Sequence, residues 1–168
     1  MKWHPALVRI LAIAPLAAAA AAPAWSQGLI NTHRIPAALA AKEVAAAVDT
    51  CAKQGFPVTS ALLDVDGVLQ AELRGDGAGI HTVQVAHDKA YTAISFRINT
   101  SVMMANAEKA PPSPAVAKLP NLILAPGGVV IKHGEEILGA ISVSGVPNRT
   151  GDEACANAGL EIINDRLK

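Results

Sequence analysis

Apolar residues recur at helical spacing between residues 80 and 97, directly after a glycine-rich turn. One face of this predicted helix repeats apolar residues three and four positions apart, which predicts packing against a sheet; it comprises Val83, Ala86, Ala90, Ala93 and Ile94. A face that meets only water would not need Val85 and Phe96, so we expect a ligand, a partner subunit or both to cover the opposite side. That opposite face carries His81, Val85, Asp88, Lys89, Thr92 and Phe96.

The remaining periodic segments predict three further helices and five strands. Helical spacing covers 36–54, 101–109 and the C-terminal segment from Thr150 or Asp152. Short links between the strands, such as Asp66-Gly67, predict hairpins and hence an α+β fold with a five-stranded antiparallel sheet flanked by helices. Residues 110–120 contain four prolines and are expected to be irregular. The predicted strands are 58–64, 68–74, 122–124, 129–132 and 137–144.

The first 26 residues have the pattern of a secretory signal peptide. Lys2 and Arg9 precede an uncharged run over 10–22, and small residues around Ala24 provide a cleavage site. The run is shorter than the roughly 20 residues of a membrane span. We therefore expect a periplasmic or secreted protein with a single domain over 27–168 and no membrane span after cleavage; the alternative is a retained membrane anchor.

Composition excludes some classes of partner. With Lys2 and Arg9 removed, 12 basic side chains face 14 acidic ones, and no basic cluster suggests nucleic-acid binding. Aromatic residues make up only 3% of the chain, which argues against stacking sites for sugars or single-stranded nucleic acid.

Two cysteines, Cys51 and Cys155, lie on the apolar sides of the first and last predicted helices. In an oxidising compartment they are a disulfide candidate if those helices pack together. The alternative is a pair of buried free thiols. Their spacing fits no metal site.

The glycine cluster at 75–79 does not belong to a nucleotide-binding loop. Ile80 stands where a dinucleotide fingerprint needs its third glycine, and no Gly-Lys-Ser/Thr follows. A helix N-terminus after small residues still favours an anion, although a turn that simply requires glycine geometry explains the cluster equally well.

Polar side chains on the central helix suggest a binding site. Lys89 suits a carboxylate, His81 suits metal ligation or proton exchange, and the Thr92 hydroxyl suits hydrogen bonding or coordination. Ordinary surface positions are the alternative. His33, His87 and His133 are scattered, and we expect isolated histidines of this kind to be surface residues; no zinc, covalent haem or nucleophile-elbow motif is present.

Taken in order, several motifs resemble the GlcG/HbpS-like haem-binding family and the C-terminal domain of PduO-type proteins. They are Leu-Asp-Val-Asp-Gly at 63–67, Arg-x-Asp-Gly-Ala at 74–78, Val-Ala-x-x-Lys-Ala-Tyr-Thr-Ala at 85–93, Pro-Gly-Gly at 126–128 and Leu-Gly-Ala-Ile-x-Val-Ser-Gly at 138–145. The resemblance spans Pro36 to Leu167. Residues 146–152 depart from the Gly-Gly-Thr-like turn that the family commonly has before an Asp.

The resemblance implies a profilin-like or roadblock-like α-β-α layout and homo-oligomers, from dimers to octamers. It also implies haem binding in some members, with iron ligated by a helix threonine or histidine, and redox sensing in one extracellular system. Lys89 and Thr92 match the family's Lys-Ala-x-Thr segment, whereas Arg74, Asp76 and Gly77 match its Arg-x-Asp-Gly turn.

We therefore predict an exported, oligomeric small-molecule binding protein with haem as the favoured ligand. Lys89 and Arg74 would neutralise carboxylates, Thr92 or His81 would approach the iron, and Val85 and Phe96 would contact the macrocycle. One alternative is an enzyme of the same scaffold acting on a small organic acid, with Lys89 or His81 as acid/base and Asp76 as orienter. The other is a purely structural protein whose covered helix face is a subunit interface.

Overall fold

A computed structural model describes residues 1, 28, 31–148 and 150–167. Apart from Met1, the predicted signal peptide lies outside the described residues. The segment Thr32–Lys168 forms one compact unit. Among the described helices, none combines the length and apolar character needed to cross a membrane.

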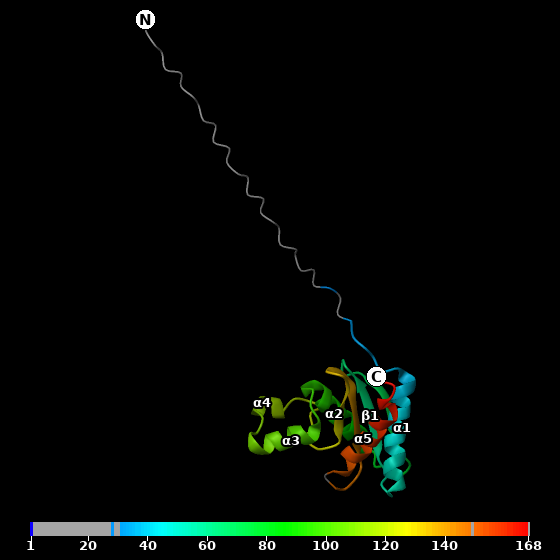
Figure 1. Cartoon of the computed structure of the whole chain (residues 1–168). Helices are drawn as coiled ribbons and strands as arrows, with labels where there is room; N and C mark the ends of the chain where they lie inside the picture. The colour runs from blue at the N-terminus through cyan, green and yellow to red at the C-terminus, as the bar shows by residue number, and fades with distance from the viewer. Residues whose placement is uncertain (2–27, 29–30, 149, 168) are drawn as a thin grey trace. The chain divides into compact units, whose positions relative to one another are not determined.

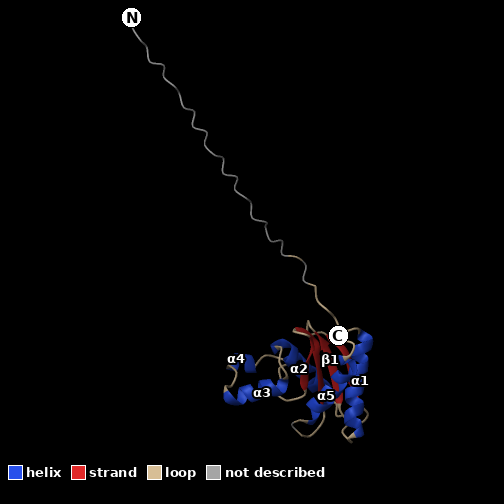
Figure 2. Cartoon of the chain, in the orientation of Figure 1, coloured by secondary structure: helices blue, strands red, loops and turns tan. Residues whose placement is uncertain are grey.

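Within the described residues, four antiparallel strands form one sheet in the order β2-β1-β4-β3. Helices α1 and α5 cover one face, α2 covers the other, and α3 and α4 lie beyond α2 (Figures 1 and 2). The strands are β1 (Thr59–Asp64), β2 (Leu69–Arg74), β3 (Gly128–His133) and β4 (Glu136–Ser144). The helices are α1 (Ala37–Lys53), α2 (His81–Phe96), α3 (Thr100–Lys109), α4 (Pro114–Ala117) and α5 (Gly151–Asn164).

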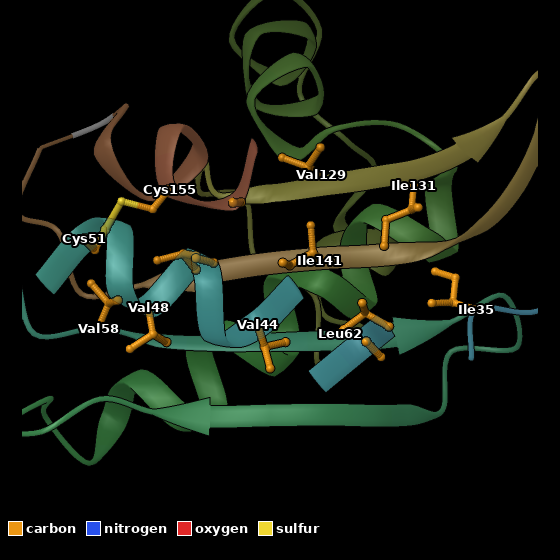
Figure 3. Packing of buried hydrophobic residues seen from close by; sticks show 14 of the residues in the cluster. Ile35, Val44, Val48, Cys51, Val58, Leu62, Val129, Ile131, Ile141 and Cys155 are labelled. Carbon is orange, nitrogen blue, oxygen red and sulfur yellow. A yellow bond between two sulfur atoms is a disulfide. The ribbon is translucent and has the colours of Figure 1, made fainter. Parts of the chain in front are cut away.

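Alternation along β1 sends its side chains into two separate cores. Leu62 joins the large cluster beneath α1 and α5, whereas Ala61 and Leu63 join a smaller cluster beneath α2. In the larger cluster, Ile35 lies near one end of the sheet and the cysteines near the other (Figure 3). The smaller cluster contains Ala86, Ala90, Ala93 and Ile94, so the apolar face predicted for the central helix packs on the sheet, except that Val83 is only partly buried and lies outside the cluster.

Helices α1 and α5 pack closely and are joined covalently. Cys51 and Cys155 form a disulfide with an S–S distance of 2.05 Å, the pairing that the sequence left open. A Cβ at Gly159 of α5 would lie 2.7 Å from the Glu43 carbonyl oxygen and 3.0 Å from Ala47 Cβ, so only glycine permits this approach. Glu43 is itself fully buried, and neither carboxyl oxygen has a hydrogen-bond partner among the described residues. Burial raises the pKa of Glu43 to about 8.

The prediction of a fifth strand over 122–124 is wrong. This segment lies between Pro120 and Pro126, and Asn121 has a left-handed backbone with φ of 62°. The Ile123 amide donates to Thr92 Oγ1 at 2.9 Å instead of to a neighbouring strand. The apolar Leu-Ile-Leu run therefore has strand propensity but no strand partner.

The proline-rich region over 110–120 is also more regular than expected, because it contains the short helix α4. Pro114 occupies the beginning of the helix, where its missing amide hydrogen costs nothing. The Ser113 hydroxyl accepts a hydrogen bond from the Val116 amide at 3.4 Å and so caps this turn.

Candidate functional site

The glycine turn before α2 is held by hydrogen bonds within the protein. Gly77 has a φ of 77°, a left-handed conformation that favours glycine. The Thr82 hydroxyl lies 2.6 Å from the Gly79 carbonyl oxygen and 2.7 Å from the Thr59 hydroxyl, which ties the start of α2 to β1. The Arg74 guanidinium donates to the Ala78 carbonyl. Arg74 is thus engaged with the turn itself, while the Asp76 side chain beside it is exposed.

Lys89 forms a buried ion pair with Asp152 of α5. Lys89 Nζ lies 2.6 Å from Asp152 Oδ2 and 3.2 Å from the Val143 carbonyl oxygen, and the two residues are 4% and 6% exposed. Asp152 Oδ1 also accepts from the Val146 amide at 2.9 Å. Gly127 makes room for the pair, because a Cβ there would lie 3.0 Å from Lys89 Nζ. The partner of Lys89 is therefore Asp152 rather than the expected orienter Asp76.

Thr92 is fully buried, and its hydroxyl both donates and accepts a hydrogen bond. It donates to the Asp88 carbonyl at 2.7 Å and accepts from the Ile123 amide at 2.9 Å. Gly128 also lies against this side of α2, since a Cβ there would meet the Lys89 carbonyl oxygen at 2.5 Å. The protein's own chain therefore covers the middle of the helix face for which a ligand or a partner subunit was expected.

The outer residues of that face remain more open. His81 is exposed, Val85 is partly buried and Phe96 is 41% exposed. His81 and Lys89 are eight residues apart, or about 12 Å along the helix axis, so they do not converge on a small ligand. The His81 ring folds over its own turn, because a Cβ at Gly79 would lie 2.6 Å from a ring carbon.

Residues 119–126, which we call the covering segment, border three cavities on the α2 side of the sheet. The Lys89 and Asp152 pair borders the first, of about 300 Å³, together with Met104 of α3 and Leu124. The second, about 280 Å³, lies between α3, α4 and residues 122–124. The third, about 270 Å³, adjoins Tyr91 and Phe96.

Arg74 and Asp76 instead line a separate cavity of about 380 Å³ against α1. The predicted site residues that line these cavities are therefore spread over three of them, with Lys89 and Phe96 at two cavities on the other face of the sheet. The sequence analysis did not assign Asp152 to the site. The local sequence around Asp152 indicates only an acidic residue in the first turn of the last helix, which is common at helix N-termini.

The structure limits which of these side chains can hold a metal. A haem iron needs a side-chain donor with a free lone pair at an accessible position. Thr92 is buried, and its hydroxyl already donates to the Asp88 carbonyl and accepts from the Ile123 amide of the covering segment. In this position of the covering segment Thr92 therefore cannot ligate a haem iron. In the described part of the chain, no three His, Cys, Asp or Glu side chains are grouped to hold a metal ion.

Comparison with known proteins gives a consistent set of relatives. Residues 35–161 match the sequence profile of the family described as "Haem degrading protein HbpS-like". The crystal structure of HbpS is 30% identical, with a TM-score of 0.75 over 83% of this chain and 98% of that chain. A double mutant of HbpS from Streptomyces reticuli is 31% identical, with a TM-score of 0.75 over 86% of this chain and 99% of that one.

The crystal structure of a PduOC:Heme complex shares the fold at 19% identity. Its TM-score is 0.72 over 79% of this chain and 96% of that chain. No curated protein sequence matches the chain.

Proposed function

We propose, since the chain belongs to the HbpS-like family of haem-degrading proteins, that it is an exported haem-binding protein that acts as a homo-oligomer in haem handling or redox sensing. The match over residues 35–161 carries this proposal, because it covers nearly all of the compact unit. A relative with the same fold is described as a haem complex, which supports haem as the ligand.

Two features support export to the periplasm or beyond the cell. The N-terminal 26 residues have the order of a signal peptide, and the Cys51–Cys155 disulfide is typical of proteins in oxidising compartments. Self-association is supported by large apolar side chains that remain exposed on the α2 side of the sheet. They are Phe96, Val102, Leu119 and Leu124.

A haemin titration of the mature chain from residue 27, followed by absorbance, tests the function. We expect a saturable change in the Soret band at a fixed ratio of haem to subunit. Weak uptake that does not saturate would contradict haem binding, because exposed apolar surfaces take up haem without a defined site. Size-exclusion chromatography with light scattering, with and without haemin, tests the oligomer.

A second candidate function is an enzyme that acts on a small organic acid. The buried Lys89 and Asp152 pair at the wall of a cavity of about 300 Å³ favours it, because such a pair can hold or move a proton beside a bound ligand. Turnover that is lost in Lys89→Met, while haem binding is retained, would support this function. Unchanged turnover in that variant would exclude Lys89 as its acid or base.

A further inference from the structure

Two histidines that are 100 positions apart in the sequence lie side by side in the structure. His33 belongs to the arm before α1, and His133 ends β3. Their ring centroids are 5.7 Å apart and their planes are tilted by 59°. No sequence motif connects them, because neither belongs to a metal-binding pattern.

Each ring has its Nδ1 atom held by a hydrogen-bond acceptor. His33 Nδ1 lies 2.7 Å from Glu136 Oε2, and the His33 backbone amide donates to Glu136 Oε1 at 3.0 Å. His133 Nδ1 contacts the Leu167 carbonyl oxygen. A backbone carbonyl only accepts, and so does an ionised carboxylate, so Nδ1 carries the hydrogen in both rings. In a neutral imidazole this leaves the Nε2 lone pair free to bind a metal.

This arrangement is typical of histidines that ligate metals in proteins. A carboxylate or a carbonyl that accepts from one ring nitrogen fixes the tautomer and orients the other nitrogen towards the metal. Ordinary surface histidines have no such need for a fixed ring. Here two adjacent rings are fixed by two different acceptors, which come from β4 and from the C-terminal end of the chain.

Both rings border a cavity of about 320 Å³ whose lining suits an amphiphilic anion. Apolar side chains lie beside two arginines, of which Arg34 pairs with Asp66 at 2.6 Å and with Asp64 at 3.3 Å. A ligand with an apolar body and carboxylate groups matches this combination of apolar and cationic groups. The other lining residues are Pro36, Leu39, Leu138, Arg166 and Leu167.

The number of ligands decides which kind of metal fits. A bare zinc ion in a structural site takes four protein ligands, and no three His, Cys, Asp or Glu side chains group for that purpose in the part of the chain that the structure describes. Glu136 is already engaged by His33. Haem iron already has four porphyrin nitrogens, so it needs only one or two axial ligands from the protein.

We propose that His33 and His133 bind one haem iron through their Nε2 atoms, beside the cavity formed by the arm, β3 and the C-terminal end. This inference rests on the proposed haem-binding function and moves the iron from α2 to the opposite side of the sheet. Glu136 is a positioning residue, because it acts through the His33 ring. Arg166 is the lining cation that would face the carboxylates of the ligand, because Arg34 is already paired with Asp64 and Asp66.

The test uses the mature chain without a polyhistidine tag, together with His33→Ala and His133→Ala. Absorbance and electron paramagnetic resonance spectra of the wild-type complex with ferric haem should show low-spin iron with two imidazole ligands. Each variant should lose that signature, and added imidazole should restore it. Both positions are exposed, so thermal unfolding of the variants without haem should be unchanged.

His81→Ala is the matched control, because His81 is an exposed histidine on α2 that the sequence analysis predicted as a candidate iron ligand. It should leave the spectrum unchanged. Glu136→Gln should keep the low-spin spectrum but weaken haem binding by about 10- to 100-fold, the range found when a residue that supports a metal ligand is replaced.

The possible outcomes distinguish a failure of the proposed histidine site from a failure of the proposed haem-binding function. Saturable haem binding with a spectrum that neither His33→Ala nor His133→Ala alters, or that only one of them alters, overturns the shared site while the haem-binding function stands. Unsaturable uptake by the wild-type chain overturns both. Binding of Ni²⁺ that depends on the two histidines, with a haem spectrum that does not, assigns the pair to a free cation and overturns the haem site.

Discussion

The two faces of the sheet bury different kinds of side chain. The face under α1 and α5 buries large aliphatic side chains such as Leu62 and Ile141, and a disulfide joins its two helices. The face under α2 buries mostly alanine together with polar side chains that are hydrogen-bonded. The buried polar residues that contact α2 or belong to it are Thr59, Thr82, Lys89, Thr92, Ser142 and Asp152.

This difference indicates which interactions hold the helices of each layer on the sheet. Aliphatic burial is not directional, so in the α1 and α5 layer the covalent bond and the close approach at Gly159 set the position of the helices. The α2 layer instead depends on particular donor and acceptor pairs, each of which is costly to break. Glu43 contradicts the pattern, because it is a buried carboxyl in the aliphatic layer without a hydrogen-bond partner in the part of the chain that the structure describes.

The largest expected effect comes from removing the disulfide. The double variant Cys51→Ala/Cys155→Ala opens a loop with a sequence separation of 104 residues. A loop of about this length is worth up to roughly 4.7 kcal/mol in the chain-entropy treatment, so the free energy of unfolding in urea should fall towards that limit. Wild-type protein under reducing conditions should give the same value. An unchanged free energy of unfolding would mean that aliphatic packing alone fixes the α1 and α5 layer.

Breaking the buried ion pair tests the α2 layer by the same measurement, the free energy of unfolding in urea. Lys89→Met leaves the buried charge of Asp152 without its partner, which should lower the free energy of unfolding by about 3–5 kcal/mol. Adding Asp152→Asn removes that charge and should recover part of the loss while an oxygen remains for the Val146 amide. A double variant no more stable than Lys89→Met would show that the cost does not come from an unpaired charge.

Glu43 makes the stability of the aliphatic layer depend on pH. Its folded pKa of about 8 lies above the ordinary value of 4.5, so the folded protein keeps a proton that the unfolded chain releases. Stability should therefore fall as pH rises through this window, by about 1.4 kcal/mol for each pH unit and roughly 3 kcal/mol between pH 5.5 and 7.5. Glu43→Gln should remove this slope in urea unfolding. Glu161→Gln, at an exposed position of α5, should keep it.

Sequence reasoning succeeded where the determining contacts are local. The spacing of Ala86, Ala90 and Ala93 was enough to predict the packed face of α2, and the family motifs led to the HbpS-like family that the profile match confirms. It failed for 122–124, because strand propensity does not reveal that the Ile123 amide is bound by a threonine hydroxyl.

Long-range pairs were equally invisible in the sequence. Lys89 and Asp152 are 63 positions apart, and His33 and His133 are 100 apart, so no periodicity relates either pair. In each case the fold brings together residues from segments that are far apart in the chain. Residue types named at single positions therefore indicated possible chemistry, but they did not identify which residues act together.

The smallest expected effect concerns the hydrogen bond that fixes the covering segment to α2. Thr92→Val keeps the shape of the side chain but leaves the Ile123 amide without its acceptor, which should cost about 1–2 kcal/mol. Hydrogen exchange at that amide should accelerate more than at the β4 amides, because the loss is local. Thr50→Val is the matched control, since the Thr50 hydroxyl donates to the Ala46 carbonyl within its own helix, α1. If exchange at Ile123 were equally slow in both variants, packing of the apolar side chains rather than the threonine would hold the segment. The α2 layer would then depend on directional bonds only at the Lys89 pair and at the Thr82 and Ser142 hydroxyls.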